Sequence, residues 1–193
     1  MKLSSIAALL LLTAAPLAAF SIQMLSDVEM GVTAPDRPAD SRELDAGRKP
    51  VEVLTFLGLK HGDKVLDVMA GGGYYTEIMA RAVGPKGYVV ALEPPQFVKT
   101  DKAKAAWTAL IDRDKNVGLM LMSPQNVALA PASFDFVLMH LVYHDAYWES
   151  AKYDFKRMDP AAFLKVVFSA TRPGGIVGVV DHVGPAGGDT RAT

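Results

Sequence analysis

Three consecutive glycines, Gly71, Gly72 and Gly73, follow an apolar run that contains one acidic residue, Asp67. Glycine lets backbone N–H groups approach a ligand closely, and a helix that begins after such a loop has a partial positive charge at its N-terminus. Glu93 ends the next apolar run. A carboxylate about 20 residues after a glycine loop can accept hydrogen bonds from the hydroxyls of a ribose. These residues predict a site for a nucleoside-containing cofactor.

Two cofactor classes fit this arrangement: a dinucleotide, bound by the pattern GxGxxG, and S-adenosylmethionine, which needs no diphosphate cradle. Thr76 stands where the dinucleotide pattern needs glycine or alanine for close helix packing. Asp67 supplies an acid at the strand end for a cationic amino group, which S-adenosylmethionine carries. The pattern therefore favours S-adenosylmethionine, and an NAD(P)-binding oxidoreductase is the less favoured alternative.

Residues that could move a proton follow the apolar run Phe134–His140. Imidazole has an ordinary pKa of roughly 6.5, which is the closest of the side chains to operating pH. His144 is therefore the first candidate for a general base, and Asp145 is the second.

A metal site has to be weighed because His140 and His144 are four residues apart, and Asp145, Asp181 and His182 are expected to lie close to them at neighbouring strand ends. The spacing of the two first histidines aligns side chains only on a helix, and the segment at His140 is expected to be a strand. We expect no bound metal. Asp181 and His182 are expected to line the substrate side or to begin a loop.

The composition is that of one globular domain: 193 residues, of which 50% are hydrophobic and 21% are charged. The 20 Lys and Arg residues are balanced by 21 Asp and Glu residues, so there is no basic surface for nucleic acid. No cysteine is present, which excludes thiol nucleophiles, thiolate metal sites and disulfides. Any chemistry must come from oxygen and nitrogen side chains.

Residues 1–19 are predicted to be a secretory signal peptide or, if uncleaved, an N-terminal anchor. Lys2 precedes an apolar stretch shorter than the roughly 20 residues of a spanning helix, and Ala18 and Ala19 offer a cleavage point. No other segment is apolar enough to span a membrane. We expect a protein exported to the periplasm, or held at the inner membrane by its uncleaved N-terminus.

Strand-like apolar runs alternate with helical periodicity along residues 48–193. The predicted strands are 64–69, 88–92, 117–122, 134–140 and 176–180, and the predicted helices are 48–57, 75–83, 102–112 and 160–171. This alternation predicts a doubly wound, Rossmann-like α/β domain whose mostly parallel sheet binds ligands at the carboxyl ends of its strands. Residues 20–47 show no sustained helical or strand period and are predicted to form a connecting arm.

These motifs resemble the class I S-adenosylmethionine-dependent methyltransferases, and specifically a bacterial group of predicted, often exported methyltransferases with an alanine- or proline-glycine-glycine-glycine loop. The residues that carry the resemblance are 45–50, 65–77, Glu93, 134–140, His144, Asp145 and 172–175. The resemblance implies a bound S-adenosylmethionine with its methionine end over Asp67 and the three glycines, its ribose on Glu93 and its sulfonium facing His140. The implied reaction is methyl transfer to a small-molecule acceptor.

The chain departs from that family in the loop and after the third strand. The family loop begins with glycine where this chain has Met69, which can trace the loop only with a negative φ. The acid that often contacts adenine in the family is replaced by Ser123. We therefore expect Ser123 or Asn126 to hydrogen-bond the adenine amine.

A further departure concerns the sheet, because the family has more strands than the five predicted before Thr193. The fold is then a class I methyltransferase sheet that lacks the last C-terminal strands. The edge of the fifth strand is expected to be unpaired unless another chain covers it, which suggests a homodimer through that edge. The alternative to an active enzyme is a truncated, non-catalytic methyltransferase-like binding protein.

Overall fold

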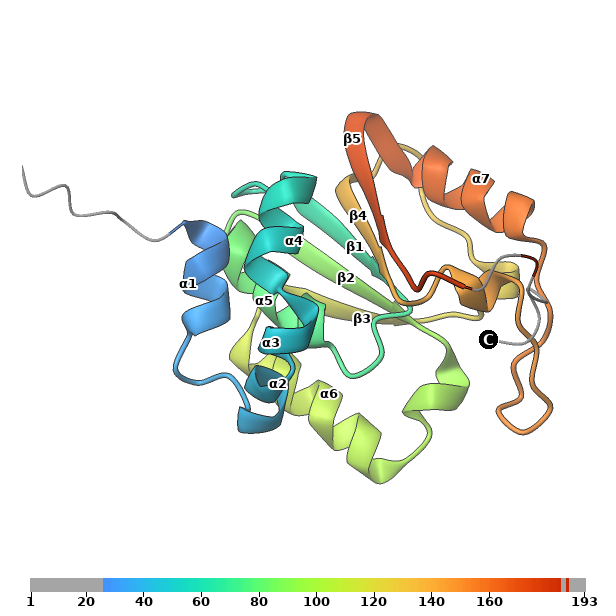
Figure 1. The fold of residues 1–193 in the computed structure, drawn as a ribbon, viewed down its shortest axis with the longest axis horizontal. Coiled ribbons are helices and arrows are strands. Elements are labelled where there is room, and N and C mark those ends of the chain that lie inside the picture. Colours follow the sequence, from blue (N-terminus) through green and yellow to red (C-terminus); the bar gives the residue numbers. More distant parts are fainter. Residues whose placement is uncertain (1–25, 185–186, 188–193) are drawn as a thin grey trace, which may run out of the picture.

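Five apolar runs form one parallel sheet in the computed structural model, which describes residues 26–184 and 187 (Figure 1). The strands are β1 (Lys64–Val68), β2 (Tyr88–Glu93), β3 (Val117–Leu121), β4 (Phe134–His140) and β5 (Thr171–Val180), in the order β3-β2-β1-β4-β5. The chain moves outward from β1 in one direction and then crosses to β4 on the other side, so the strand order reverses between β1 and β4. A crevice at the carboxyl ends of these two strands is where open α/β sheets bind ligands.

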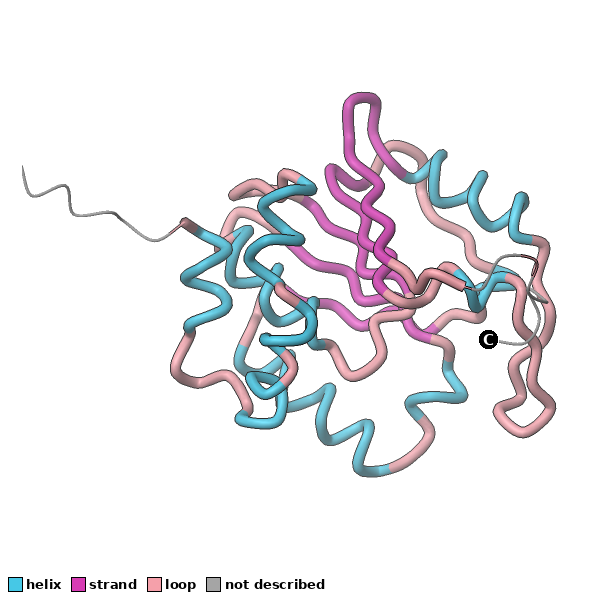
Figure 2. Tube along the Cα trace, viewed as in Figure 1, coloured by secondary structure: helices cyan, strands magenta, loops and turns pink. Residues whose placement is uncertain are grey.

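Helices cover both faces of the sheet, as the alternation in the sequence predicts (Figure 2). The α-helices are α1 (Asp27–Thr33), α2 (Ala39–Glu43), α3 (Asp45–Arg48), α4 (Pro50–Leu57), α5 (Tyr74–Val83), α6 (Asp101–Arg113) and α7 (Pro160–Ala170). Three 3₁₀ turns, η1 (Pro95–Val98), η2 (Pro124–Asn126) and η3 (His144–Ala146), follow β2, β3 and β4. The doubly wound α/β prediction is confirmed.

Each face of the sheet has its own apolar cluster. Leu54 of α4, Ile78 of α5 and Trp107 of α6 belong to the first cluster, and Phe163 and Val167 of α7 belong to the second. The central strands are buried on both sides, which explains why they read as continuous apolar runs rather than as alternating ones.

The prediction that residues 20–47 form a connecting arm is wrong for the part that the structure describes. Residues 26–47 contain α1 and α2 and most of α3. Helix α1 begins with a capping box, in which Glu29 N donates to Ser26 Oγ at 3.2 Å and Ser26 N donates to Glu29 Oε2 at 2.7 Å. Helix α1 has seven residues, of which only Val28 and Gly31 are buried. Two buried positions are too few to show a helical period in the sequence.

The N-terminal helices are fastened to the domain by a buried guanidinium. Arg37 is 2% exposed, and its two terminal nitrogens donate to both carboxylate oxygens of Asp45 at 2.9 Å. Tyr74 at the start of α5 donates its hydroxyl to Asp45 Oδ1 at 2.7 Å. Bidentate pairs of this kind fix orientation as well as charge. The N-terminal segment is therefore part of the packed structure.

Strand β5 begins earlier than residue 176, where the sequence places its start. Phe134 pairs with Thr171 and Phe136 pairs with Ile176, so the residues between them form an irregular excursion that Figure 2 shows at the top of the sheet. Within the described part of the chain, β5 pairs with β4 only. Its Ile176 and Val179 side chains are exposed. The predicted homodimer through this edge stays a prediction.

The predicted signal peptide at residues 1–19 lies outside the described residues. Among the residues that the structure describes, no helix has the length and apolar character needed to cross a membrane.

Two helical glycines allow a matched test of how α1 packs on α5. A Cβ at Gly31 would lie 2.7 Å from the backbone oxygen of Ile78, whereas a Cβ at Gly47 would meet nothing within 4 Å. Gly47→Ala should raise the free energy of unfolding by about 0.5–1 kcal/mol, because alanine loses less entropy in a helix. Gly31→Ala should lower it by about 1–3 kcal/mol through overpacking. Urea denaturation measures the free energy of unfolding of both variants. Equal stabilisation by the two substitutions would contradict the described packing of α1 on α5.

Candidate active site

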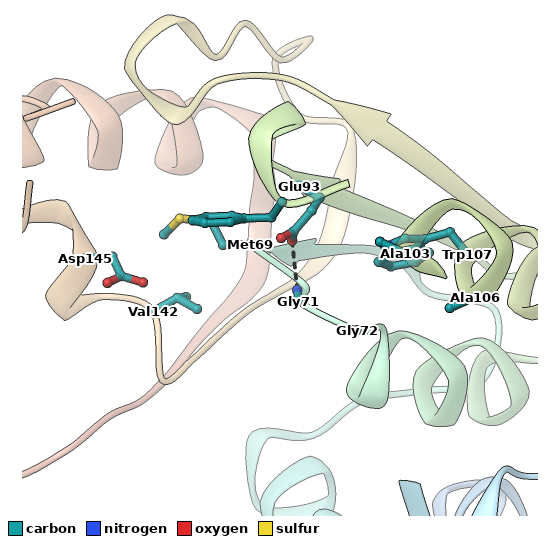
Figure 3. Close-up of a pocket in the computed structure, with 10 residues that line it drawn as sticks. Met69, Gly71, Gly72, Glu93, Ala103, Ala106, Trp107, Val142 and Asp145 are labelled. Atoms are coloured by element: carbon teal, nitrogen blue, oxygen red, sulfur yellow. Dashed lines mark hydrogen bonds between the residues drawn. The ribbon is translucent and has the colours of Figure 1, made fainter. Parts of the chain in front are cut away.

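The loop after β1 and the end of β2 are joined by one hydrogen bond. Gly71 N donates to Glu93 Oε2 at 2.7 Å, as Figure 3 shows. Glu93 is only 2% exposed. Burial raises the pKa of Glu93 to about 8, the Gly71 N–H opposes this, and the nearby Asp67 carboxylate adds to it. Glu93 is thus a buried carboxyl group that a ligand's hydroxyl groups would stabilise in its charged form.

The backbone of this loop turns through the left-handed region three times. Gly71 has φ 60° and Gly73, the N-cap of α5, has φ 81°. The expectation that Met69 keeps a negative φ is wrong, because Met69 has φ 50°. A side chain in this conformation costs roughly 1–2 kcal/mol. The Met69 side chain is 8% exposed and packs with Leu66 and Leu92, so its burial offsets that cost.

Asp67 lies beneath the glycine loop and is 3% exposed. Thr76 Oγ1 donates to Asp67 Oδ2 at 2.5 Å, which gives Thr76 a role that the sequence does not suggest. Burial raises the pKa of Asp67 to about 7, and the hydrogen bonds from Thr76 limit the rise. A cationic group beside Asp67 would favour its ionised form.

Two cavities meet at the glycine loop. The larger, of about 410 Å³, is lined by Glu93, Phe97, Ala103, Ala106, Trp107 and Asp145, and the smaller, of about 180 Å³, by Arg48, Asp67, Ala70, Tyr74, Tyr75, His140 and Leu141. Both are bordered by Met69, Gly71, Gly72 and Val142. In Figure 3, Asp145 and Trp107 lie at opposite ends of the larger cavity, with Glu93 and Gly71 between them. A ligand that extends along the loop would occupy both cavities.

His140 ends β4 and forms one wall of the smaller cavity. Its ring centroid lies 4.5 Å from that of Tyr75. Burial lowers the pKa of His140 to about 4, and the positive charge of Arg48 lowers it further. His140 is therefore neutral near pH 7, and it adds no positive charge to this cavity.

His144 and Asp145 lie in η3, just beyond β4, and His144 has a partner at the end of β5. His144 Nδ1 lies 2.7 Å from Asp181 Oδ1, and His144 N donates to Asp181 Oδ2 at 3.0 Å. His144 Nε2 lies 3.5 Å from Asp145 Oδ1. From the sequence we expected Asp181 near His144 at a neighbouring strand end, lining the acceptor side or beginning a loop, but we did not predict that Asp181 orients His144.

The two aspartates around His144 differ in acidity. Burial raises the pKa of Asp181, but hydrogen bonds from His144 and His182 outweigh it and hold that pKa below its ordinary value. The pKa of Asp145 is raised above its ordinary value, mainly by burial. The charge of His144 opposes this rise, and the negative charge of Asp181 adds to it. Asp181 is thus ionised at neutral pH, and it favours the tautomer in which His144 Nδ1 carries the proton.

Ser123 and Asn126 do not line either cavity. The Ser123 hydroxyl donates to Gln125 Oε1, and Asn126 lies in η2. Met122 N donates to Glu93 O at 3.1 Å, so Ser123 directly follows a residue that is bonded to the end of β2. The structure instead brings Phe97 and Trp107 to the larger cavity, and these two aromatic residues were missed in the sequence.

Solved structures of methyltransferases share the fold of this protein. A SAM-dependent methyltransferase from Aquifex aeolicus aligns with a TM-score of 0.55 and 25% identity over 75% of this chain and 72% of its own. An arsenic (III) S-adenosylmethionine methyltransferase from Chlamydomonas reinhardtii aligns with a TM-score of 0.55 and 22% identity over 80% of this chain and 48% of its own. The chain has the fold of the class I S-adenosylmethionine-dependent methyltransferases and is similar in sequence to one of them over three quarters of its length.

Sequence comparison adds a narrower likeness in the N-terminal half of the sheet. The family model of protein-L-isoaspartate(D-aspartate) O-methyltransferase matches residues 48–121. A protein-L-isoaspartate O-methyltransferase from Methanothrix thermoacetophila is 29% identical over 107 residues, which are 51% of each chain. Another, from Ignicoccus hospitalis, is 51% identical over 35 residues, 18% of this chain and 17% of its own. The match with this chain thus spans about half of the length of the first of these relatives and about a sixth of the length of the second.

The three loop glycines should differ in their tolerance of alanine. A Cβ would meet nothing within 4 Å at Gly71 or Gly72, whereas at Gly73 it would lie 2.5 Å from Leu110 Cδ1. Chemical denaturation should show a free energy of unfolding for Gly72→Ala within about 0.5 kcal/mol of the wild-type value. Gly71→Ala should lower the free energy of unfolding by about 1–2 kcal/mol, because φ is positive at this position. Gly73→Ala should lower the free energy of unfolding by about 2–5 kcal/mol, since overpacking against Leu110 adds to the backbone strain. Equal losses at Gly71 and Gly73 would contradict the packing of α6 under the loop.

Proposed function

We propose that this protein is an enzyme that transfers the methyl group of S-adenosylmethionine to a small molecule bearing a hydroxyl, amine or thiol. The observation that carries the proposal is the meeting of two cavities at the glycine loop, with a buried Glu93 on one side and the His144–Asp181 pair beyond Asp145. The cavities beside Glu93 suit a nucleoside-containing methyl donor, and the His144–Asp181 pair suits an acceptor that must lose a proton.

The donor is proposed to lie across both cavities. Glu93 would accept hydrogen bonds from the ribose hydroxyls, and Phe97 would offer an apolar surface to the adenine. In the smaller cavity Asp67 would face the amino group of the methionine part. Arg48, whose guanidinium lies 4.5 Å from the centre of the Tyr74 ring, would bind its carboxylate. A neutral His140 beside the sulfonium avoids repulsion between two cations.

Methyl transfer is an in-line displacement, so the protein must align the two reactants and remove the acceptor proton. When bound, S-adenosylmethionine would supply a methyl carbon for attack by the acceptor atom, and the electron pair of the broken carbon–sulfur bond would remain on its sulfur. The acceptor proton passes to Nε2 of His144, because Nδ1 already carries the proton shared with Asp181. Asp145 and Asp181 then stabilise the imidazolium that forms.

Isoaspartyl peptides are a second candidate acceptor, favoured by the family model that matches residues 48–121. That match ends with β3 and includes neither η3 nor β5, so it covers the proposed donor half of the site only. A carboxylate acceptor has no proton to lose, and Asp145 and Asp181 would repel it. These two aspartates favour a protic, uncharged or cationic acceptor.

Export to the periplasm, or attachment to the inner membrane through an uncleaved N-terminus, is part of the proposal. Its support is the sequence itself, in which Lys2 precedes the only strongly apolar stretch. A homodimer through β5 is also part of the proposal, because in the described part of the chain one edge of this strand pairs with no other strand.

The first experiment is calorimetric titration with S-adenosylmethionine, S-adenosylhomocysteine and NAD. Both sulfur ligands should bind and NAD should not. Glu93→Ala should weaken binding of both by about 10- to 100-fold, because charge-assisted hydrogen bonds contribute about 1.5–3 kcal/mol each. Glu43→Ala, which removes an exposed carboxylate from α2, is the matched control and should bind normally. Undiminished affinity of Glu93→Ala would remove Glu93 from the donor site.

The second experiment addresses the base with a panel of hydroxyl, amine and thiol acceptors and an isoaspartyl peptide. His144→Ala should slow transfer to the best protic acceptor by about 100-fold or more, since it removes general-base catalysis. Its affinity for S-adenosylhomocysteine should be unchanged. The control is His61→Ala, at a half-exposed histidine beside Asp27. Unchanged turnover of His144→Ala, or activity on the isoaspartyl peptide alone, would contradict the proposed acceptor class.

A further inference from the structure

We propose that His144, Asp181 and His182 form a binding site for a divalent transition-metal ion such as Zn²⁺. One ligand atom from each of the three residues lies within 4.8 Å of the other two. The residues come from η3 and from the chain just after β5, at the carboxyl edge of the sheet. From the sequence we weighed five residues for such a site and expected no bound metal: His140, His144, Asp145, Asp181 and His182. In the structure the two histidines of the cluster are His144 and His182, which are 38 positions apart in the chain.

The distances suit coordination after a small adjustment. His144 Nδ1 and Asp181 Oδ1 are 2.7 Å apart, and the ring centroids of His144 and His182 are 5.4 Å apart. Two ligand atoms about 2.1 Å from a tetrahedral zinc ion lie about 3.4 Å apart. The ion would therefore take the place of the proton that His144 and Asp181 share, and these two atoms would move apart by about 0.7 Å.

The donor set selects the kind of ion. Two imidazoles and one carboxylate favour borderline ions such as Zn²⁺, Co²⁺, Ni²⁺ and Fe²⁺, whereas Mg²⁺ and Ca²⁺ prefer oxygen ligands. Three protein ligands on one side leave further coordination positions open to solvent. No thiolate is available in this chain, so binding would not require reducing conditions.

The surroundings already hold the ligands in position. Asp181 accepts hydrogen bonds from His144 N at 3.0 Å and from His182 N at 2.8 Å, so its carboxylate is oriented by two backbone groups. Asp145 Oδ1 lies 3.5 Å from the other ring nitrogen of His144. A carboxylate behind a ligating histidine fixes the ring and makes it a stronger ligand.

Occupancy of this site has a consequence for the proposed reaction. The ion engages the imidazole that serves there as the base, so the filled site inhibits methyl transfer. The metal site itself does not depend on the proposed function, and its test measures metal binding directly.

The test uses the full chain without a polyhistidine tag and titrates it with ZnCl₂ and CoCl₂ by calorimetry. The wild type should bind one equivalent of each ion. His182→Gln should weaken binding by at least about 100-fold, because it removes a direct ligand. His61→Gln is the matched control: His61 Nδ1 lies 3.7 Å from Asp27 Oδ2, so it also removes a histidine beside a carboxylate. It should bind as the wild type does.

The His182 variant distinguishes a metal site from a hydrogen-bonded pair that contains only His144 and Asp181. Its side chain makes no hydrogen bond to His144 or Asp181 among the described contacts, so a pair that only orients His144 is insensitive to its loss. Equal binding by His182→Gln and the wild type, or no stoichiometric binding by the wild type, would overturn the proposal. Asp181→Asn gives a second test and should also lose the ion while the far-ultraviolet circular dichroism stays native.

Discussion

The hydrogen bond from Gly71 to the buried Glu93 carboxylate is the interaction on which the rest of the site depends. It joins the loop after β1 to the end of β2 and holds the backbone of the glycine turn between the two cavities. The carboxyl group remains buried because the loop covers it, and the loop keeps its course because the carboxyl group accepts its N–H. Glycine at position 71 adopts the φ of 60° in this turn without the strain that a side chain would add.

The strands could be predicted from the sequence because parallel strands are buried on both faces and read as short apolar runs between turn residues. The site could be predicted only in part. Asp67, the three glycines, Glu93 and His140 stand at strand ends or on the adjoining loop, where the fold class brings them together. The pairing of His144 with Asp181 joins residues from two loops, and no local pattern in the sequence indicates it.

The remaining differences come from tertiary structure that overrides local signals. Met69 adopts φ 50° because burial of its side chain with Leu66 and Leu92 offsets the backbone strain. Helices α1 to α3 are too short for a hydrophobic period to be visible, and their stability comes from caps, from packing against α5 and from the buried Arg37. Ser123 and Asn126 follow β3 as expected, but neither of them lines either cavity.

The two tyrosines that open α5 both reach back to α3. Tyr74 donates its hydroxyl to Asp45, and Tyr75 donates its hydroxyl to the backbone oxygen of Arg48 at 2.9 Å. The first turn after the glycine loop is therefore also the anchorage of the N-terminal helices. Any ligand that orders this turn also stabilises those helices, and their docking in turn strengthens ligand binding by the same free energy, since such coupling is reciprocal. Through this thermodynamic linkage, a segment that contributes only Arg48 to a cavity wall helps to set the affinity of the whole site.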